Sequence, residues 1–240
     1  MKAERPMSLM SRRAALQLSG AAIVGLGPLA AAASHAQGPA PAADFPDKLV
    51  EQKLREVVAL PLNADGTAKE FPASSLTPVA DIGLADHNGK KPVPFELDTT
   101  KAKLRVFGNV MKRRGSLSLV DLQTLPVRTQ ITKLQCGAPK PSGVIKWTGV
   151  SFADVCRLLQ VDPMAQYVMF VAGDGYVTTE DMAVATHPQA IIAWQMNDGP
   201  IPAPHGAPFR FVIPTRWGAR NIKRITEIRF TATAFGFNNS

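Results

Sequence analysis

A continuous apolar run from Tyr167 to Ala172 sets the first limit on how this chain folds. The run ends in the turn residues Gly173-Asp174-Gly175, and its pattern is typical of a strand that is buried on both faces. A turn is expected at residues 147–150. Further strands are predicted over residues 103–107, 131–135, 190–196, 209–213 and 227–234.

Two short helices are predicted between these strands. Ser118 and Ser151 are each followed three residues later by an aspartate, Asp121 or Asp154, in the spacing of a capping box. Pro126 ends the first of these helices. Helices that alternate with strands, joined by hairpin-like and by longer connections, indicate a mixed, strand-rich α+β fold.

Length and charge narrow the class of protein. At 240 residues with 45% hydrophobic content, the chain can bury a full core as a single domain. Beyond residue 36, 23 Lys and Arg stand against 18 Asp and Glu, and the basic residues are scattered rather than run together. This balance suits an anionic ligand or an acidic partner, and no nucleic acid is expected as a partner.

The first 36 residues resemble a twin-arginine export signal. Arg12 and Arg13 precede a weakly apolar run from Leu18 to Ala33, and Ser34-His35-Ala36 ends it as a signal peptidase site would. The run of about 16 residues is shorter than the roughly 20 that a spanning helix needs, so no permanent membrane anchor is expected. The prediction is a signal over residues 1–36, a lead-in with loops over 37–91, a main domain over 92–240, and a periplasmic location.

Two cysteines offer different chemistry. Cys136 follows a predicted strand and precedes a loop rich in glycine and proline, where a thiolate can be a soft ligand for a transition metal. The alternative is a small buried hydrophobe, which is the simplest interpretation of Cys156. A third possibility is a Cys136–Cys156 disulfide in a structural module, because the periplasm is oxidising.

A basic cluster lies between His205 and Lys223. It holds one His, three Arg and one Lys within 19 residues, interrupted by glycine. Such a cluster can hold a phosphate through charge-assisted hydrogen bonds, and Gly218 permits close approach of the backbone. A solvated basic loop fits the same spacing.

Four segments together resemble the molybdopterin-binding domain of the sulfite oxidase family. They are Leu134-Gln135-Cys136, Trp147-Thr148-Gly149-Val150, the run from Met196 through Pro202 with His205 to Arg210, and Gly218 to Lys223. The similarity covers roughly Pro92 to Phe230. It implies that residues 92–240 adopt the sulfite-oxidase-like fold and bind Mo-molybdopterin.

The resemblance also implies roles for individual residues. Cys136 would be the metal-binding and catalytic thiolate on molybdenum, while the chemistry itself belongs to the cofactor. His205 and Arg210 would hold the pterin phosphate. The residues that would close over this phosphate are Asn221, Ile222 and Lys223.

Further positions carry over from the family less directly. Asp174 would meet a polar edge of the pterin, and His87 and Asn88 fall where the family has a pterin-contacting pair, though in a different order. Tyr176 is the nearest aromatic hydroxyl that could reach the metal, and is our candidate second catalytic residue. After the cysteine the family's sulfite oxidases carry arginines, whereas this chain offers only Lys140, which disfavours sulfite as the substrate.

The resulting expectation is an exported molybdenum oxidoreductase that acts on a small-molecule substrate. The alternative is a non-catalytic periplasmic protein that keeps the fold and the pterin pocket. No Cys-x-x-Cys-His motif occurs in the sequence, so electrons are expected to pass to a cytochrome c or a membrane haem protein.

Overall fold

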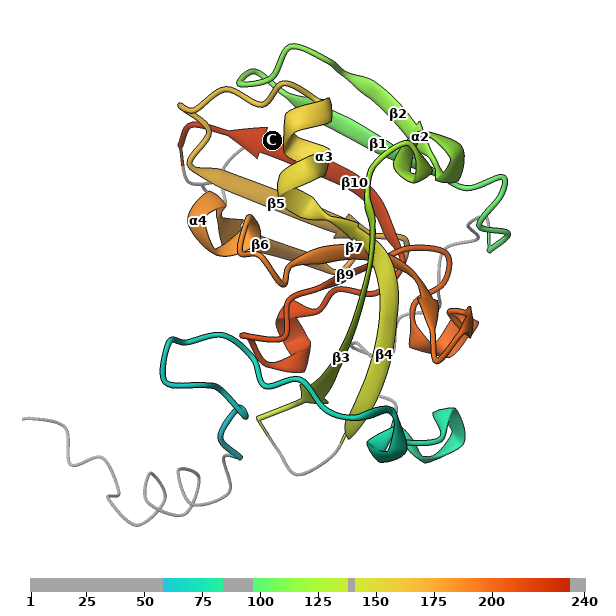
Figure 1. Cartoon of the computed structure of the whole chain (residues 1–240). Helices are drawn as coiled ribbons and strands as arrows, with labels where there is room; N and C mark the ends of the chain where they lie inside the picture. The colour runs from blue at the N-terminus through green and yellow to red at the C-terminus, as the bar shows by residue number, and fades with distance from the viewer. Residues whose placement is uncertain (1–57, 84–96, 138–140, 234–240) are drawn as a thin grey trace, which may run out of the picture. The chain divides into compact units, whose positions relative to one another are not determined.

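The structure is a computed structural model that describes residues 58–83, 97–137 and 141–233. Within these ranges the chain forms two β-sheets (Figure 1). The first sheet has the strand order β2-β1-β10-β5-β6, and the second has the order β3-β4-β7-β8, with β9 also paired to β7. Among these pairs only β1 and β10 run parallel. The strands are β1 (Lys103–Gly108), β2 (Gly115–Ser118), β3 (Val127–Gln135), β4 (Ser142–Ser151), β5 (Tyr167–Ala172), β6 (Val177–Asp181), β7 (Ile191–Met196), β8 (Gly199–Pro200), β9 (Arg210–Val212) and β10 (Ile225–Thr231).

Helices in the described ranges are short. They are α2 (Leu119–Gln123), α3 (Phe152–Leu158), α4 (Met182–Ala185) and the 3₁₀ turns η1 (Ala73–Ser75), η2 (Val79–Asp81), η3 (Ala203–His205) and η4 (Gly218–Arg220). None of the described helices is long and apolar enough to cross a membrane. The strand-rich α+β class predicted from the sequence is confirmed.

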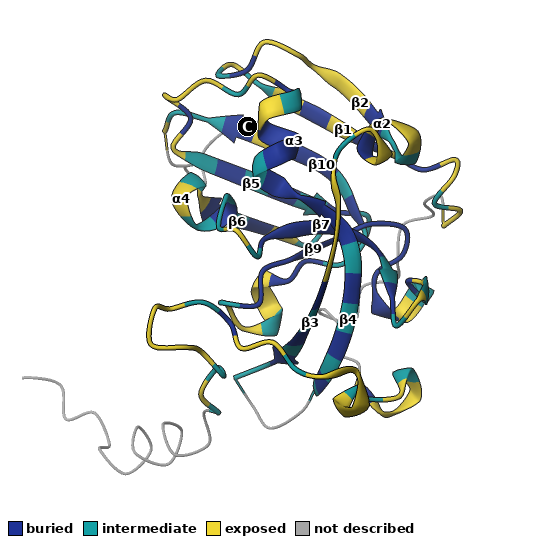
Figure 2. Cartoon of the chain, viewed as in Figure 1, coloured by how far each residue is buried: buried dark blue, intermediate teal, exposed yellow. Residues whose placement is uncertain are grey.

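The strand that is buried on both faces is β7 rather than β5. In β5 buried residues alternate with half-buried ones, because only one face of the first sheet packs against the core. In β7, Ile192 and Trp194 enter one core while Ile191 and Ala193 enter a second, and the strand is buried except at Gln195 (Figure 2). The sequence-based prediction for residues 167–172 was therefore right about the strand and wrong about its burial.

Aromatic side chains from both sheets and α3 form the larger core. The ring of Phe152 on α3 lies 5.2 Å from that of Phe170 and 5.5 Å from that of Phe211, centroid to centroid. Phe170 and Phe211 stack at 4.2 Å, which joins β5 to β9. This packing fixes α3 over one face of the first sheet (Figure 1).

The two predicted helix caps have different outcomes. Ser118 and Asp121 form a complete capping box at the start of α2, as predicted. Ser151 does occupy the N-cap position of α3, but its side chain makes no capping bond. The predicted second capping box is wrong because the Asp154 carboxylate forms an ion pair with Arg157 instead.

The predicted turn at residues 147–150 is also wrong, because these residues continue β4. Gly149 makes this possible where β4 meets β7, since a Cβ at this position would lie 2.1 Å from the Ile192 carbonyl oxygen. The register between the two strands shifts between Thr148 and Gly149. Trp147, two residues before Gly149 in β4, is buried in the second core and lies beneath the functional site.

Candidate functional site

The loop that leaves β3 presents the thiol of Cys136. The residue is half-buried, its N–H donates to the Pro141 carbonyl, and it lies against η4. A Cβ at Gly218 would lie only 2.7 Å from the Cys136 Sγ, so glycine is what lets the η4 backbone approach the sulfur. Burial raises the pKa of the Cys136 thiol, whereas Arg210, Lys223 and a hydrogen bond from the Gly218 backbone favour the thiolate.

Arg210 is a buried cation at the start of β9. Its side chain is 2% exposed, its guanidinium lies 5.1 Å from the centroid of the Trp147 ring, and its Nη1 donates to the His205 carbonyl at 2.9 Å. Among the described residues, the Nε atom has no hydrogen-bond partner and no carboxylate forms an ion pair with the side chain. Burial lowers the pKa of Arg210 to about 10, with Cys136 acting in the opposite direction. A buried charge with an unused donor indicates a site for an anion.

His205 and Lys223 complete a convergent set of donors. Burial lowers the pKa of His205, and the charges of Arg210 and Lys223 lower it further, while a hydrogen bond to the Val79 backbone acts in the opposite direction. The Lys223 Nζ donates to the Pro204 carbonyl at 3.1 Å. Gly206 has a φ of +112°, and a Cβ there would lie 2.8 Å from the Lys223 Cβ, so glycine lets η3 and Lys223 lie together.

The basic side chains and the Cys136 thiol line one small cavity of about 80 Å³. It is lined by Gly83, Leu134, Cys136, Pro141, His205, Arg210, Gly218, Ala219 and Lys223. The volume lies below the roughly 300–1,000 Å³ of sites that enclose a whole ligand, so these described walls fit one charged group of a larger molecule.

The donor set fits a metal that brings most of its own ligands. No group of three or more His, Cys, Asp or Glu that could hold a metal ion occurs within the described ranges. A single soft thiol beside three basic side chains suits an anionic cofactor that carries a soft metal. Mo-molybdopterin, with its dithiolene sulfurs and its phosphate, matches this pattern.

Two other predicted site residues, Asn221 and Ile222, do not line this cavity. The Asn221 side chain is buried and holds the preceding loop, because its Oδ1 accepts from the Ile213 N–H and its Nδ2 donates to the carbonyls of Ile213, Arg216 and Trp217. Ile222 lies in the larger core. His87 and Asn88 lie outside the described residues.

Asp174 and Tyr176 lie at the β5–β6 turn. The Asp174 Oδ1 accepts from the Tyr176 N–H at 3.1 Å, and its other oxygen lies 3.9 Å from Arg224, which donates to η3. The Tyr176 hydroxyl donates to the Ala219 carbonyl at 3.1 Å. Both residues thus contact the segments that flank the thiol cavity without lining it.

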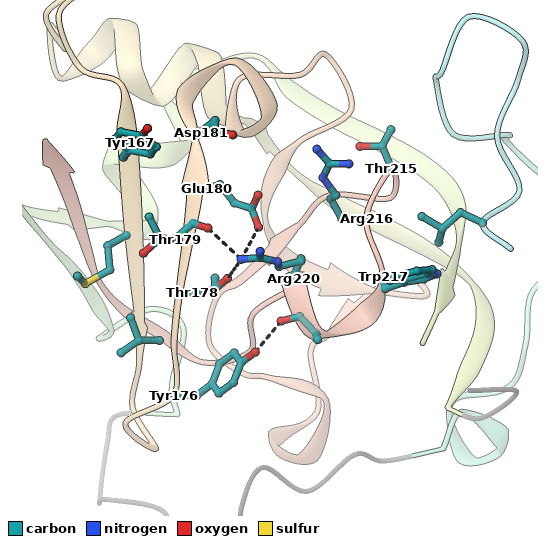
Figure 3. Close-up of a pocket in the computed structure, with 14 residues that line it drawn as sticks. Tyr167, Tyr176, Thr178, Thr179, Glu180, Asp181, Thr215, Arg216, Trp217 and Arg220 are labelled. Carbon is teal, nitrogen blue, oxygen red and sulfur yellow. Dashed lines mark hydrogen bonds and ion pairs between the residues drawn. The ribbon is translucent and has the colours of Figure 1, made fainter. Parts of the chain in front are cut away.

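A second, larger cavity of about 1090 Å³ lies on the other side of η4 (Figure 3). All five residues of β6 line it, opposite Thr215 to Trp217 and Arg220. The Arg220 Nη1 donates to the Thr178 hydroxyl at 3.0 Å and to the Thr179 carbonyl at 2.9 Å, and it lies 3.3 Å from the Glu180 carboxylate. Sequence analysis included Arg220 in the basic cluster but gave no sign of this cavity, because β6 is polar and was not predicted.

The two cysteines are free thiols and do not form the disulfide considered from the sequence. Cys156 lies in the larger core on α3, where burial raises its pKa to about 12. It is a buried structural thiol, as its apolar neighbours predicted.

The fold and the thiol cavity together define a protein that binds an anionic, metal-carrying cofactor. The chain belongs to the oxidoreductase molybdopterin binding domain family, whose sequence profile matches residues 90–237. The sulfite oxidase resemblance seen in the sequence motifs is thereby confirmed.

Known relatives agree with this assignment. The chain is 33% identical over 135 residues to the protein-methionine-sulfoxide reductase catalytic subunit of Xanthomonas campestris, covering 50% of this chain and 42% of that protein. It is 29% identical over 197 residues to human mitochondrial sulfite oxidase, covering 70% of this chain and 35% of that protein. The chain spans about half the length, or less, of the first curated relatives it matches.

A solved structure shows the same fold. The sulfane dehydrogenase SoxCD from Paracoccus pantotrophus superposes with a TM-score of 0.59 at 15% sequence identity. The match covers 87% of this chain and 56% of that chain.

Proposed function

We propose that the protein is an exported molybdenum-cofactor oxidoreductase that transfers an oxygen atom to or from a small substrate. The observation that supports this most directly is the convergence on one cavity of the Cys136 thiol and the buried Arg210, whose Nε has no hydrogen-bond partner among the described residues. When bound, the cofactor supplies a molybdenum centre that changes by two electrons as an oxygen atom is passed. In the reducing direction, substrate oxide takes up two electrons and two protons and yields the reduced substrate and water.

The residues of this chain would bind and orient the cofactor. Cys136 would give up its proton and bind molybdenum through Sγ, with the Gly218 N–H stabilising the charge on the sulfur. Arg210, His205 and Lys223 would hold the phosphate through charge-assisted hydrogen bonds. Asp174, Asn221, Ile222, His87 and Asn88 remain proposed cofactor contacts, and Tyr176 remains a proposed catalytic residue.

We propose a periplasmic location and a separate electron carrier, either a cytochrome c or a membrane haem protein. The twin arginines Arg12 and Arg13 support the location, and the absence of a Cys-x-x-Cys-His motif from the sequence supports an external haem. The electron carrier would supply or accept the two electrons one at a time. Relatives named as methionine-sulfoxide reductases make a sulfoxide the first substrate to test.

Replacing single cysteines tests the proposal. Cys136→Ser replaces the soft sulfur with a poorly acidic hydroxyl, so viologen-linked reduction of methionine sulfoxide should fall at least about tenfold and the metal absorption should change. Pterin, measured after release by its fluorescence, should stay bound through the phosphate contacts. Cys156→Ser is the matched control and should cost some stability while leaving the metal spectrum alone. Identical metal absorption in the two variants would contradict the assignment of Cys136.

A further inference from the structure

Two core-facing positions of β6 carry polar side chains. Thr178 and Glu180 lie opposite Phe170 and Val168 of β5, and directly opposed residues of an antiparallel pair share a face of the sheet. Phe170 and Val168 are fully buried in the larger core, while Thr178 is 5% exposed and Glu180 is 6% exposed. A strand that only closed the core would carry apolar residues at these two positions, because burying polar groups costs free energy. The polar pair therefore points to a further role.

Arg220, the last residue of η4, is the partner of these polar groups. Its Nη1 donates to the Thr178 hydroxyl at 3.0 Å and to the Thr179 carbonyl at 2.9 Å, and it lies 3.3 Å from the Glu180 Oε1 (Figure 3). Among the described residues this Glu180 oxygen accepts no hydrogen bond, so its tie to Arg220 is electrostatic. One side chain thus links η4 to three consecutive residues of β6.

The ion pair itself contributes little to the stability of the fold. Burial raises the pKa of Glu180, whereas the charges of Arg220 and Arg216 lower it and the charge of Asp181 raises it. The cost of burying the carboxylate therefore offsets much of its attraction to the arginines. What such a pair can provide is a fixed geometry, because moving either partner away leaves a buried charge without its counterion.

This geometry reaches the thiol because η4 is only three residues long. The Arg220 N–H donates to the Trp217 carbonyl at 2.8 Å, and the Asn221 N–H donates to the Gly218 carbonyl at 3.0 Å, so the turn moves as one unit. At its other end, the Gly218 backbone donates a hydrogen bond that favours the Cys136 thiolate. A shift at Arg220 would therefore be felt at the sulfur.

We propose that Arg220 and Glu180 are positioning residues, which hold the Gly218 N–H against the Cys136 sulfur and so set the environment of the metal thiolate. Neither residue lines the thiol cavity, so both would act through η4. The inference rests on the proposed function for its metal. The contact between η4 and the thiol exists without the metal, which allows the two to be tested separately.

Hydrogen exchange of cofactor-free protein tests the hold on η4. Removing Arg220 alone would leave the Glu180 carboxylate buried without its partner, so the test variant combines Arg220→Met with Glu180→Gln. The double variant should unfold close to the parent temperature, because both charges are removed and similar volumes remain. Amides of residues 218–221 should exchange at least about tenfold faster, as measured by mass spectrometry of peptic fragments.

Arg216→Met is the matched control for hydrogen exchange. Arg216 acts on Glu180 through its charge and lies in the segment just before η4, so this variant removes the charge without cutting the tie to β6. Its η4 amides should exchange as in the parent. Equal exchange in the control and in the double variant overturns the proposal.

The metal signature tests what this hold does for the thiolate. In the cofactor-loaded double variant, the sulfur-to-metal absorption and the paramagnetic resonance spectrum of the one-electron-reduced metal should shift, because the Gly218 N–H is no longer fixed at the sulfur. Pterin content should match the parent, since the phosphate-binding side chains are unchanged. Arg220→Lys, which keeps a cationic donor opposite Glu180, should move both spectra back toward the parent. A pair that is merely structural would leave the spectra of the double variant unchanged, and that result overturns the proposal.

Turnover separates positioning from substrate binding. In viologen-linked reduction of methionine sulfoxide, the double variant should lose at least about fivefold in kcat while KM stays within about twofold. A raised KM with an unchanged kcat would place the pair in substrate binding and overturn the proposal. Loss of molybdenum with pterin retained supports it, because the thiolate is then no longer held for the metal. An unaltered chain without molybdenum contradicts the proposed function, while the exchange experiment still decides whether Arg220 and Glu180 hold η4 at the thiol.

Discussion

Arg210 is the residue whose environment in the structure differs most from what the sequence suggested. Its place in a basic cluster is visible in the sequence, but a solvated loop fitted that cluster equally well. The structure instead buries the guanidinium over Trp147 and leaves its Nε without a partner. Burial depends on packing between β4 and β9, which are far apart in the sequence, so residue spacing could not predict it.

Arg210→Met should therefore separate binding from stability. In cofactor-free protein, removing a buried unpaired cation should leave the unfolding free energy within about 1 kcal/mol of the parent, because methionine fills much of the same space. In cofactor-loaded protein, the lost charge-assisted contact of about 1.5–3 kcal/mol should weaken pterin binding tenfold or more, which lowers the pterin content of the purified protein. Chemical denaturation and fluorescence of released pterin measure the two effects. Arg216→Met, at an exposed arginine outside the thiol cavity, is the control, and equal pterin loss in both variants would contradict the anchoring role.

The element that organises the site is η4, a single 3₁₀ turn. It separates the two cavities, and its glycine is the only residue type that leaves room for the Cys136 sulfur. The Tyr176 hydroxyl donates to the Ala219 carbonyl and the Asn221 side chain donates to the Trp217 carbonyl, so both side chains hold this segment. Sequence analysis anticipated close backbone approach at Gly218 but placed it at a phosphate, because the contact with Cys136 joins positions 82 residues apart.

Gly218→Ala should disturb the metal site and spare the fold. The added Cβ would lie 2.7 Å from the Cys136 Sγ, and rotation of the thiol relieves this contact more easily than movement of the backbone. Molybdenum content by mass spectrometry should fall at least about tenfold, with thermal unfolding little changed. Gly137→Ala is a matched control on the other side of the same cysteine, since its Cβ would meet nothing within 4 Å. Full molybdenum occupancy in Gly218→Ala would show that the sulfur is not held as proposed.

Strands and helices could be predicted from the sequence where the signal lies within their own residues. The strands β1, β3, β5 and β7 follow from apolar pattern, and α2 follows from its cap. The strand β6 was missed because Val177-Thr178-Thr179-Glu180-Asp181 is polar, since the strand lies at an edge and lines a cavity. The Asp154 cap failed because an ion pair with Arg157 competed for the same carboxylate.

At the scale of the whole molecule, pairing between distant strands decides the architecture. The parallel contact between β1 and β10 joins Arg105 to Glu227, and no local pattern specifies such a pair. The family resemblance predicted the overall fold, which the local patterns could not, because four motifs in the same order imply the long-range topology of the family. The proposed cofactor pocket is lined by residues of β3, β9, η3 and η4 and of the loops beside them, so the chain must bring these segments together before it can hold the cofactor there.

This dependence bears on the twin-arginine export that we propose for the chain. Twin-arginine export carries folded proteins, so a chain whose cofactor site requires the complete fold can be loaded in the cytoplasm before it crosses the membrane. Replacing Arg12 and Arg13 with lysine should leave cofactor-loaded precursor in the cytoplasm, whereas Arg5→Lys, outside the arginine pair, should export normally. Cell fractionation with intact-mass analysis checks both results, and the exported parent should begin near Gln37. An unaltered chain that stays in the membrane with residues 1–36 attached would contradict the signal assignment.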